Sequence, residues 1–191
     1  MNRAQYWWNL FKTMTMSNEV RQWSEKLERQ KSALLSDVAS LGAEQIWFRP
    51  EPSSWSVADV LDHLVKVEQA SLEAVRRQLP GDAPPALGDR MRAAIVILVM
   101  RSPVRVKVPA SATQVLPEAA DPAKSEPRWS EVRKEMGDLL RSLQPEQLRR
   151  GLFRHPVSGW MTMAQALAFL SAHLRHHRYQ IDRLKSASRT V

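Results

Sequence analysis

Residues 162–185, TMAQALAFLSAHLRHHRYQIDRLK, carry the clearest helical pattern in this chain of 191 residues. Thr162 and Gln165 form a capping box, a pair that typically begins a helix. Apolar side chains then recur at helical spacings. They are Met163, Leu167, Leu170, Leu174, Ile181 and Leu184. The stretch therefore predicts a long amphipathic helix with one buried face.

Three other segments share this helical period, at residues 17–41, 56–79 and 128–143. Residues 90–100 predict a further short helix, although their Ile-Val-Ile-Leu-Val core would also suit a buried strand. Residues 102–127 hold five of the twelve prolines and have no period, which predicts an extended crossover loop. Because no segment alternates like a strand, we expect an all-α four-helix bundle with an extra short helix and a Pro-rich crossover loop.

The composition narrows the classes of protein. The chain has no cysteine, which excludes a disulfide framework, a Cys-ligated metal and a cysteine nucleophile. The longest apolar run, residues 93–100, is far shorter than the roughly 18 residues that cross a bilayer. No convincing signal peptide is present, so we expect a cytoplasmic protein that does not enter a membrane. We interpret residues 1–16 as an N-terminal extension and residues 17–188 as one domain.

The positive charge is concentrated at the C-terminal end. The chain carries a net charge of +8, and residues 149–191 hold eight basic side chains against one acidic one, Asp182. Such a segment can attract nucleic acid or another anionic partner, or it can be a solvated helix face. No aromatic interleaving or recognition motif accompanies it, so nucleic-acid binding is the least favoured function.

Histidine spacing gives the main chemical signal. His173 and His177 lie four residues apart, so their side chains share one helix face. His177 falls within the apolar stripe, and His63 borders the buried stripe of residues 56–79. Two or three imidazoles that meet between helices can bind one metal ion and leave positions open for substrate. The alternative is that each histidine is a packed side chain bonded to a carbonyl or carboxylate group.

Two stretches resemble a known family. Residues 55–68, WSVADVLDHLVKVE, resemble the opening signature of the DinB-like (DinB/YfiT) superfamily. Residues 155–184 resemble its closing signature. The matching residues there are His155, Pro156, Gly159, His173, His177, Gln180 and Ile181. The resemblance implies a four-helix bundle that binds a divalent metal, zinc or nickel, through His63, His173 and His177.

The same resemblance implies a choice of activities. Members of this superfamily include thiol S-transferases that use bacillithiol or mycothiol, and metal-dependent hydrolases. A chain without cysteine must take a sulfur nucleophile from a cosubstrate, so we expect transfer of a low-molecular-weight thiol to a small electrophile. Hydrolysis at the same metal and a non-catalytic bundle or anion-binding module are the alternatives. A homodimer is compatible with the family.

Two polar residues near the histidines are weaker catalytic candidates. Asp59 lies one turn before His63, where it could orient the imidazole or act as a base, or could simply cap the helix. Gln180 lies three residues after His177 and could bond a bound water or substrate, or be an amide at the rim of the bundle. Glu68 lies on another face of its helix, which predicts a structural role.

Overall fold

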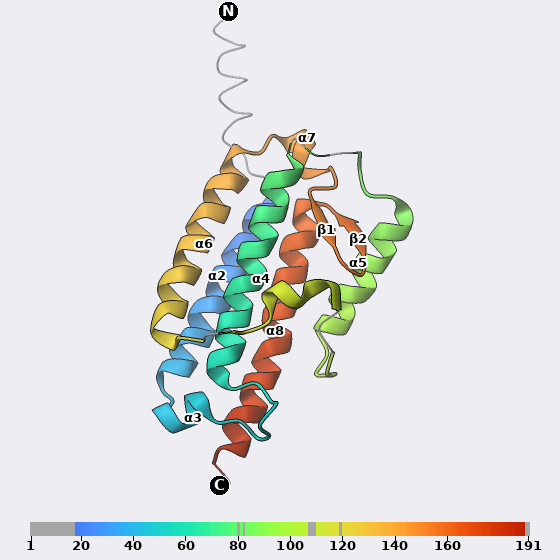
Figure 1. Ribbon diagram of the computed structural model, residues 1–191. Helices are drawn as coiled ribbons and strands as arrows, with labels where there is room; N and C mark the ends of the chain where they lie inside the picture. Colours follow the sequence, from blue (N-terminus) through green and yellow to red (C-terminus); the bar gives the residue numbers. More distant parts are fainter. Residues whose placement is uncertain (1–17, 80, 82, 107–109, 119, 190–191) are drawn as a thin grey trace, which may run out of the picture.

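The computed structural model describes residues 18–79, 81, 83–106, 110–118 and 120–189 (Figure 1). Four long helices form the bundle. They are α2 (Asn18–Ala39), α4 (Val57–Gln78), α6 (Pro122–Ser142) and α8 (Met163–Ala187). The shorter elements are α3 (Ala43–Trp47), α5 (Leu87–Met100), η1 (Ala110–Val115), α7 (Pro145–Leu148), β1 (Phe153–His155) and β2 (Gly159–Met161). The prediction of an all-α four-helix bundle is confirmed.

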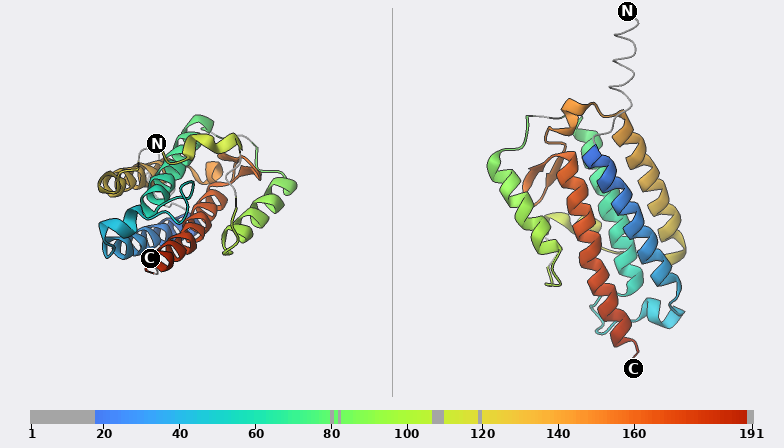
Figure 2. Two further views of the ribbon diagram at one scale, coloured as in Figure 1. Left: turned by 60° about the horizontal axis from the view of Figure 1, so that its bottom comes forward. Right: turned by 180° about the vertical axis from the view of Figure 1, so that it is seen from behind.

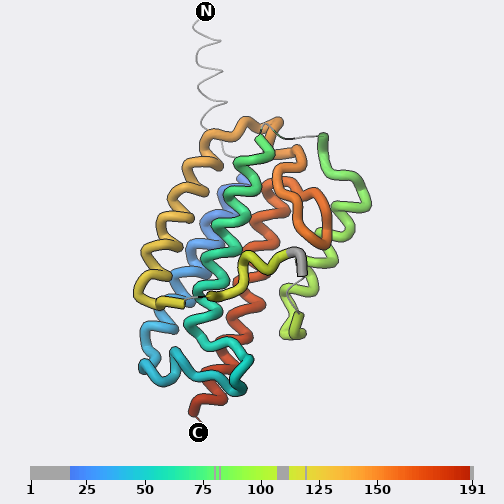
Figure 3. Tube along the Cα trace, viewed as in Figure 1, coloured from blue at the N-terminus to red at the C-terminus, as the bar shows by residue number. Residues whose placement is uncertain are grey.

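The long helices pack as two parallel pairs, α2 beside α8 and α4 beside α6 (Figures 1 and 2). The helices of the first pair run away from the N-terminal end of the bundle, and those of the second pair return. Parallel neighbours cannot be joined by a tight turn, so a long connection must lead from α4 to α6. This connection contains α5 and η1, and Figure 3 shows it crossing over α4 before α6 begins.

The bundle interior combines apolar packing with a buried ion pair between Glu68 and Arg133. Trp129 of α6 and Ile181 of α8 are fully buried in the same cluster. Glu68 of α4 is also buried, and its carboxylate accepts hydrogen bonds from Nε and Nη2 of Arg133, at 2.5 and 2.7 Å. A buried carboxylate needs such a partner because it has lost its hydration. Glu68 therefore has the structural role expected for it.

Helix α6 begins earlier than the sequence predicts, at Pro122 instead of Arg128. The carboxylate of Asp121 caps it by accepting from the amide of Ala123 at 3.1 Å. Pro127 lies inside the helix, near its start. A proline there removes the bond to the carbonyl of Ala123, one turn earlier, and leaves the rest of the helix intact. The expectation that the helix starts after Pro127 was therefore wrong.

Two further elements differ from the expectation. The crossover is not extended throughout, because residues 110–115 form the 3₁₀ helix η1. Strands β1 and β2 form an antiparallel hairpin that three-residue patterns are too short to reveal. Gly159 opens β2 with a φ of 80°, and a Cβ there would collide with the carboxylate of Asp89 on α5. The glycine thus lets the hairpin pack closely against α5.

Residues 1–16, the expected N-terminal extension, lie outside the described residues. The assignment of residues 17–188 to one domain stays a prediction. Within the described ranges, no helix has both the length and the apolar character needed to cross a membrane.

Candidate metal centre

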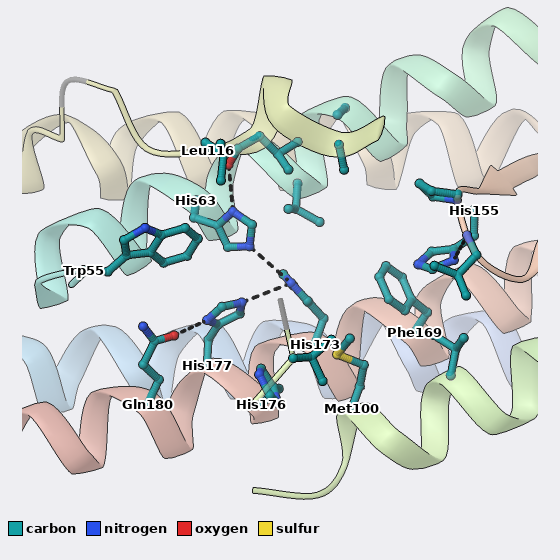
Figure 4. A pocket seen from close by; sticks show the side chains of 18 of the residues that line it. Trp55, His63, Met100, Leu116, His155, Phe169, His173, His176, His177 and Gln180 are labelled. Atoms are coloured by element: carbon teal, nitrogen blue, oxygen red, sulfur yellow. Dashed lines mark hydrogen bonds between the residues drawn. The ribbon is translucent and has the colours of Figure 1, made fainter. Parts of the chain in front are cut away.

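Helices α4 and α8 bring His63, His173 and His177 together (Figure 4). Both helices start at the predicted capping boxes, Ser56 with Asp59 in α4 and Thr162 with Gln165 in α8. These starts fix which side chains of each helix face the interior. The three imidazoles are at most 8% exposed. The structure therefore unites the three residues that the sequence proposed as ligands.

The three Nε2 atoms converge on one region. Nε2 of His173 lies 3.3 Å from Nε2 of His63 and 3.1 Å from Nε2 of His177. Two nitrogens that bind one tetrahedral zinc ion at about 2.05 Å lie about 3.3 Å apart. The separations therefore match those of imidazoles that share a metal ion.

Hydrogen bonds to the Nδ1 atoms of His63 and His177 determine that the Nε2 atoms of these rings face the cluster. Nδ1 of His63 lies 2.7 Å from the carbonyl oxygen of Val115, and Nδ1 of His177 lies 2.9 Å from Oε1 of Gln180. Both oxygens only accept hydrogen bonds, so each Nδ1 carries the proton and each Nε2 presents a lone pair. The two lone pairs both face His173.

Without a metal ion, two Nε2 lone pairs face His173, which has only one N–H group to offer them. Nε2 of His173 can donate one hydrogen bond, either to His63 or to His177, so one lone pair has no donor in the cluster at any moment. A buried polar atom without a partner is costly. One cation bound by all three Nε2 atoms would satisfy every lone pair. The donor set therefore fits a divalent metal such as zinc.

Burial also keeps the three imidazoles in the form that binds metals. It lowers the pKa of His177 to about 3 and that of His173 well below the ordinary 6.5. Burial lowers the pKa of His63 as well, although the hydrogen bond with Val115 opposes the change. All three rings are thus neutral at pH 7, which leaves their lone pairs available.

Asp59 does not orient His63. Its Oδ2 accepts hydrogen bonds from both N and Oγ of Ser56 at 2.7 Å and pairs with Nη2 of Arg49 at 2.7 Å. The carboxylate caps α4, which is the alternative that the sequence left open. The carbonyl oxygen of Val115 orients the His63 ring instead. No sequence signal could have identified Val115, because every residue has a carbonyl oxygen.

The side chain of Gln180 is not merely an amide at the rim of the bundle, because it contacts the ring of His177. It lies one turn after His177 on α8 and bonds the Nδ1 of that ring. Such outer partners orient a ligating histidine and strengthen it as a ligand. The structure therefore makes Gln180 a positioning residue for His177.

A cavity of about 1590 Å³ extends from the three histidines. Trp55 lines it beside the cluster, with its ring 4.9 Å from that of His63 and 6.1 Å from that of His177. Phe169 lines it on the side of His173, at a ring distance of 5.6 Å. Helix α5 supplies apolar side chains to another wall. They are Ile95, Val96, Val99 and Met100.

The other two histidines do not join the cluster. Nδ1 of His155 accepts hydrogen bonds from the amides of Val157 and Ser158, both at 3.2 Å, so this nitrogen organises the hairpin turn. His176 is buried beside His177 at a ring distance of 5.3 Å. Its Nδ1 has no hydrogen-bond partner among the described residues.

Known proteins resemble the chain in sequence and in fold. The family model of the DinB superfamily matches residues 26–181. The YuaE protein of Bacillus subtilis (strain 168) is 25% identical over 158 residues, which cover 78% of this chain and 89% of YuaE. The solved structure of YfiT from Bacillus subtilis matches this chain with a TM-score of 0.61 and 23% sequence identity. The match covers 91% of this chain and 90% of the YfiT chain. YfiT is described as a probable metal-dependent hydrolase with an unusual four-helix bundle topology.

Proposed function

Since this chain belongs to the DinB superfamily, we propose that it binds a divalent metal ion, zinc or nickel, and transfers a small thiol to an electrophilic small molecule. His63, His173 and His177 would hold the ion. The proposal starts from the convergence of their neutral Nε2 atoms, which belong to buried side chains that line one cavity. A divalent ion held there supplies Lewis acidity, which polarises a carbonyl group and lowers the pKa of an ionisable ligand.

The size of the cavity is the observation that favours a reaction of two organic substrates. Pockets for one small molecule commonly measure about 300–1,000 Å³. The cavity beside the three histidines measures about 1590 Å³ and so has room for a thiol and an electrophile together. The chain has no cysteine, so the sulfur must come from one of these substrates.

In the proposed reaction, the thiol sulfur forms a bond to an electrophilic carbon. The thiol proton leaves to solvent, and the leaving group departs with the electron pair of its broken bond. The protein side chains orient and shield this exchange. Val115 and Gln180 hold two of the imidazoles in place, and Trp55 and Phe169 pack against the rings.

Hydrolysis at the same centre is the second candidate. It needs water in place of the thiol and only one organic substrate. The description of YfiT as a probable metal-dependent hydrolase supports keeping it, and YfiT has the same fold.

The test is a reaction of zinc- or nickel-loaded protein with a thiol panel that includes bacillithiol and mycothiol. Monobromobimane and chlorodinitrobenzene serve as electrophiles, and mass spectrometry identifies the products. We expect thioether formation well above the rate without protein, lost in His177→Ala and kept in the matched control His176→Ala. Thioether formation at the uncatalysed rate with every thiol would refute thiol transfer. Metal-dependent hydrolysis of ester or amide substrates without thiol would then support the second candidate.

A further inference from the structure

One arginine on α8 differs from the other cations near it. Three of the four basic side chains between residues 175 and 185 interact with partners inside the molecule. These are Arg175 with Tyr179, Arg178 with Asp37 and Asp182, and Lys185 with Asp37. Arg183 forms no ion pair with any carboxylate in the described part of the chain, although it is half-buried. Asp37 and Asp182 therefore offset the charges of Arg178 and Lys185, whereas Arg183 has no carboxylate to offset its charge.

Arg183 lies where a substrate in the histidine cavity would meet it. Its side chain lines the cavity, on the same side of α8 as Gln180 and one turn further along. The six residues from His177 to Arg183 span about 9 Å along the helix axis.

The rest of the cavity lining does not neutralise this charge. Four arginines line the cavity against two glutamates. They are Arg77, Arg105, Arg154 and Arg183, with Glu51 and Glu73. Glu73 already lies 3.9 Å from Arg77. Three neutral imidazoles would add no negative charge to offset a divalent ion. The cavity therefore favours an anionic occupant.

We propose that Arg183 determines specificity by binding an anionic oxygen group of the substrate, a carboxylate or a phosphate, about two helical turns from the reacting group at the histidines. The inference rests on the proposed function and names the substrate class of that site. A guanidinium suits this role because its planar N–H groups match the two oxygens of such an anion. The substrate would thus be a small molecule with an anionic end, a spacer of several bonds and a reacting end.

The test uses cobalt(II)-loaded protein, because a thiolate that binds the ion changes its visible absorption. The probes are mercaptohexanol, mercaptohexanoate and mercaptohexyl phosphate, which share a six-carbon chain, and mercaptopropionate, which has a shorter one. The proteins are the parent chain, Arg183→Gln, Arg183→Lys and the matched control Arg178→Gln. We expect the parent to bind a long anionic thiol about ten times more tightly than mercaptohexanol, the gain of one charged hydrogen-bonded contact.

We expect Arg183→Gln to lose this preference, Arg183→Lys to keep part of it and Arg178→Gln to keep all of it. Which of the two long anions binds more tightly assigns the group as carboxylate or phosphate. Mercaptopropionate should gain little from Arg183, because its spacer is too short. The thermal unfolding of Arg183→Gln should match that of the parent, since the arginine has no carboxylate partner to lose.

Equal binding of the alcohol and both long anions to the cobalt-loaded parent would overturn the inference about Arg183 and leave the proposed metal site standing. An undiminished anion preference in Arg183→Gln would do the same. Absence of a cobalt spectrum from the parent chain is a different outcome, because it would remove the metal site and the inference together.

Discussion

All five histidines of this chain are buried, yet three of them converge and two do not. Burial lowers the pKa of all five imidazoles. The groups differ in what their nitrogens contact. In the convergent group, Nδ1 of His63 and of His177 is bonded to a fixed oxygen, and each Nε2 faces the cluster. In the other pair, Nδ1 of His155 serves a turn, and Nδ1 of His176 has no partner among the described residues.

The contrast shows that neither burial nor helix spacing alone brings a histidine into the cluster. His176 is adjacent to His177 in sequence but is rotated by about 100° around the helix. Its ring therefore packs against the edge of the His177 ring and does not meet the cluster. An outer hydrogen bond to a fixed oxygen holds Nε2 inward on two of the three convergent rings, those of His63 and His177.

The largest expected effect is a difference in metal content between two variants, one that lacks His177 of the convergent group and one that lacks His176 outside it. His177→Ala should lower the metal content from about one equivalent to near zero, because only two of the three imidazoles remain. His176→Ala should keep about one equivalent. Elemental analysis of untagged protein, purified without chelator, measures both. Equal metal content in the two variants would contradict the distinction drawn here.

A smaller effect is expected from the outer partner of His177. Gln180→Ala should lower metal affinity by about 10–100-fold, the usual cost of losing such a partner. Asp59→Ala is the control at the other candidate residue. It should leave metal affinity unchanged and destabilise the fold by about 1 kcal/mol, because it removes a helix cap. Competition with a chromogenic chelator and thermal unfolding separate the two effects, and a metal defect in Asp59→Ala would reassign its role.

A third effect concerns pH and His155. Its pKa is about 4 in the folded protein and near 6.5 when exposed. The folded state therefore binds fewer protons, and its stability is full above pH 6.5 and falls as the pH drops towards 4. This residue should cost the metal-free protein about 2 kcal/mol of unfolding free energy between pH 7 and pH 5.

His155→Asn tests this assignment, because the asparagine oxygen can still accept from the turn amides but does not titrate. Urea unfolding with chelator present should show a smaller loss between the two pH values for the variant than for the parent chain. An identical loss in both proteins would assign the acid sensitivity to other groups.

Much of this architecture could be predicted because its signals are local. The period of apolar residues predicted the four long helices, and the i, i+4 spacing put His173 and His177 on one face. The contacts that complete the site are not local. Val115 reaches His63 across 52 residues from the crossover, and its carbonyl gives no sequence signal. The hairpin was missed because its strands are three residues long. Asp59 resembled a partner of His63 in sequence, but its capping bonds occupy it.

Helix α5 shapes the cavity but takes no part in holding the histidine cluster. It provides an apolar wall of the cavity, yet it carries none of the three histidines and is not one of the four long helices. Ile95 and Val99 line the cavity and are also exposed, at 58% and 39%. Substitutions there can reshape the pocket with little effect on the bundle or on the geometry of the imidazoles. Evolution can therefore change which molecules the cavity fits while preserving the histidine cluster.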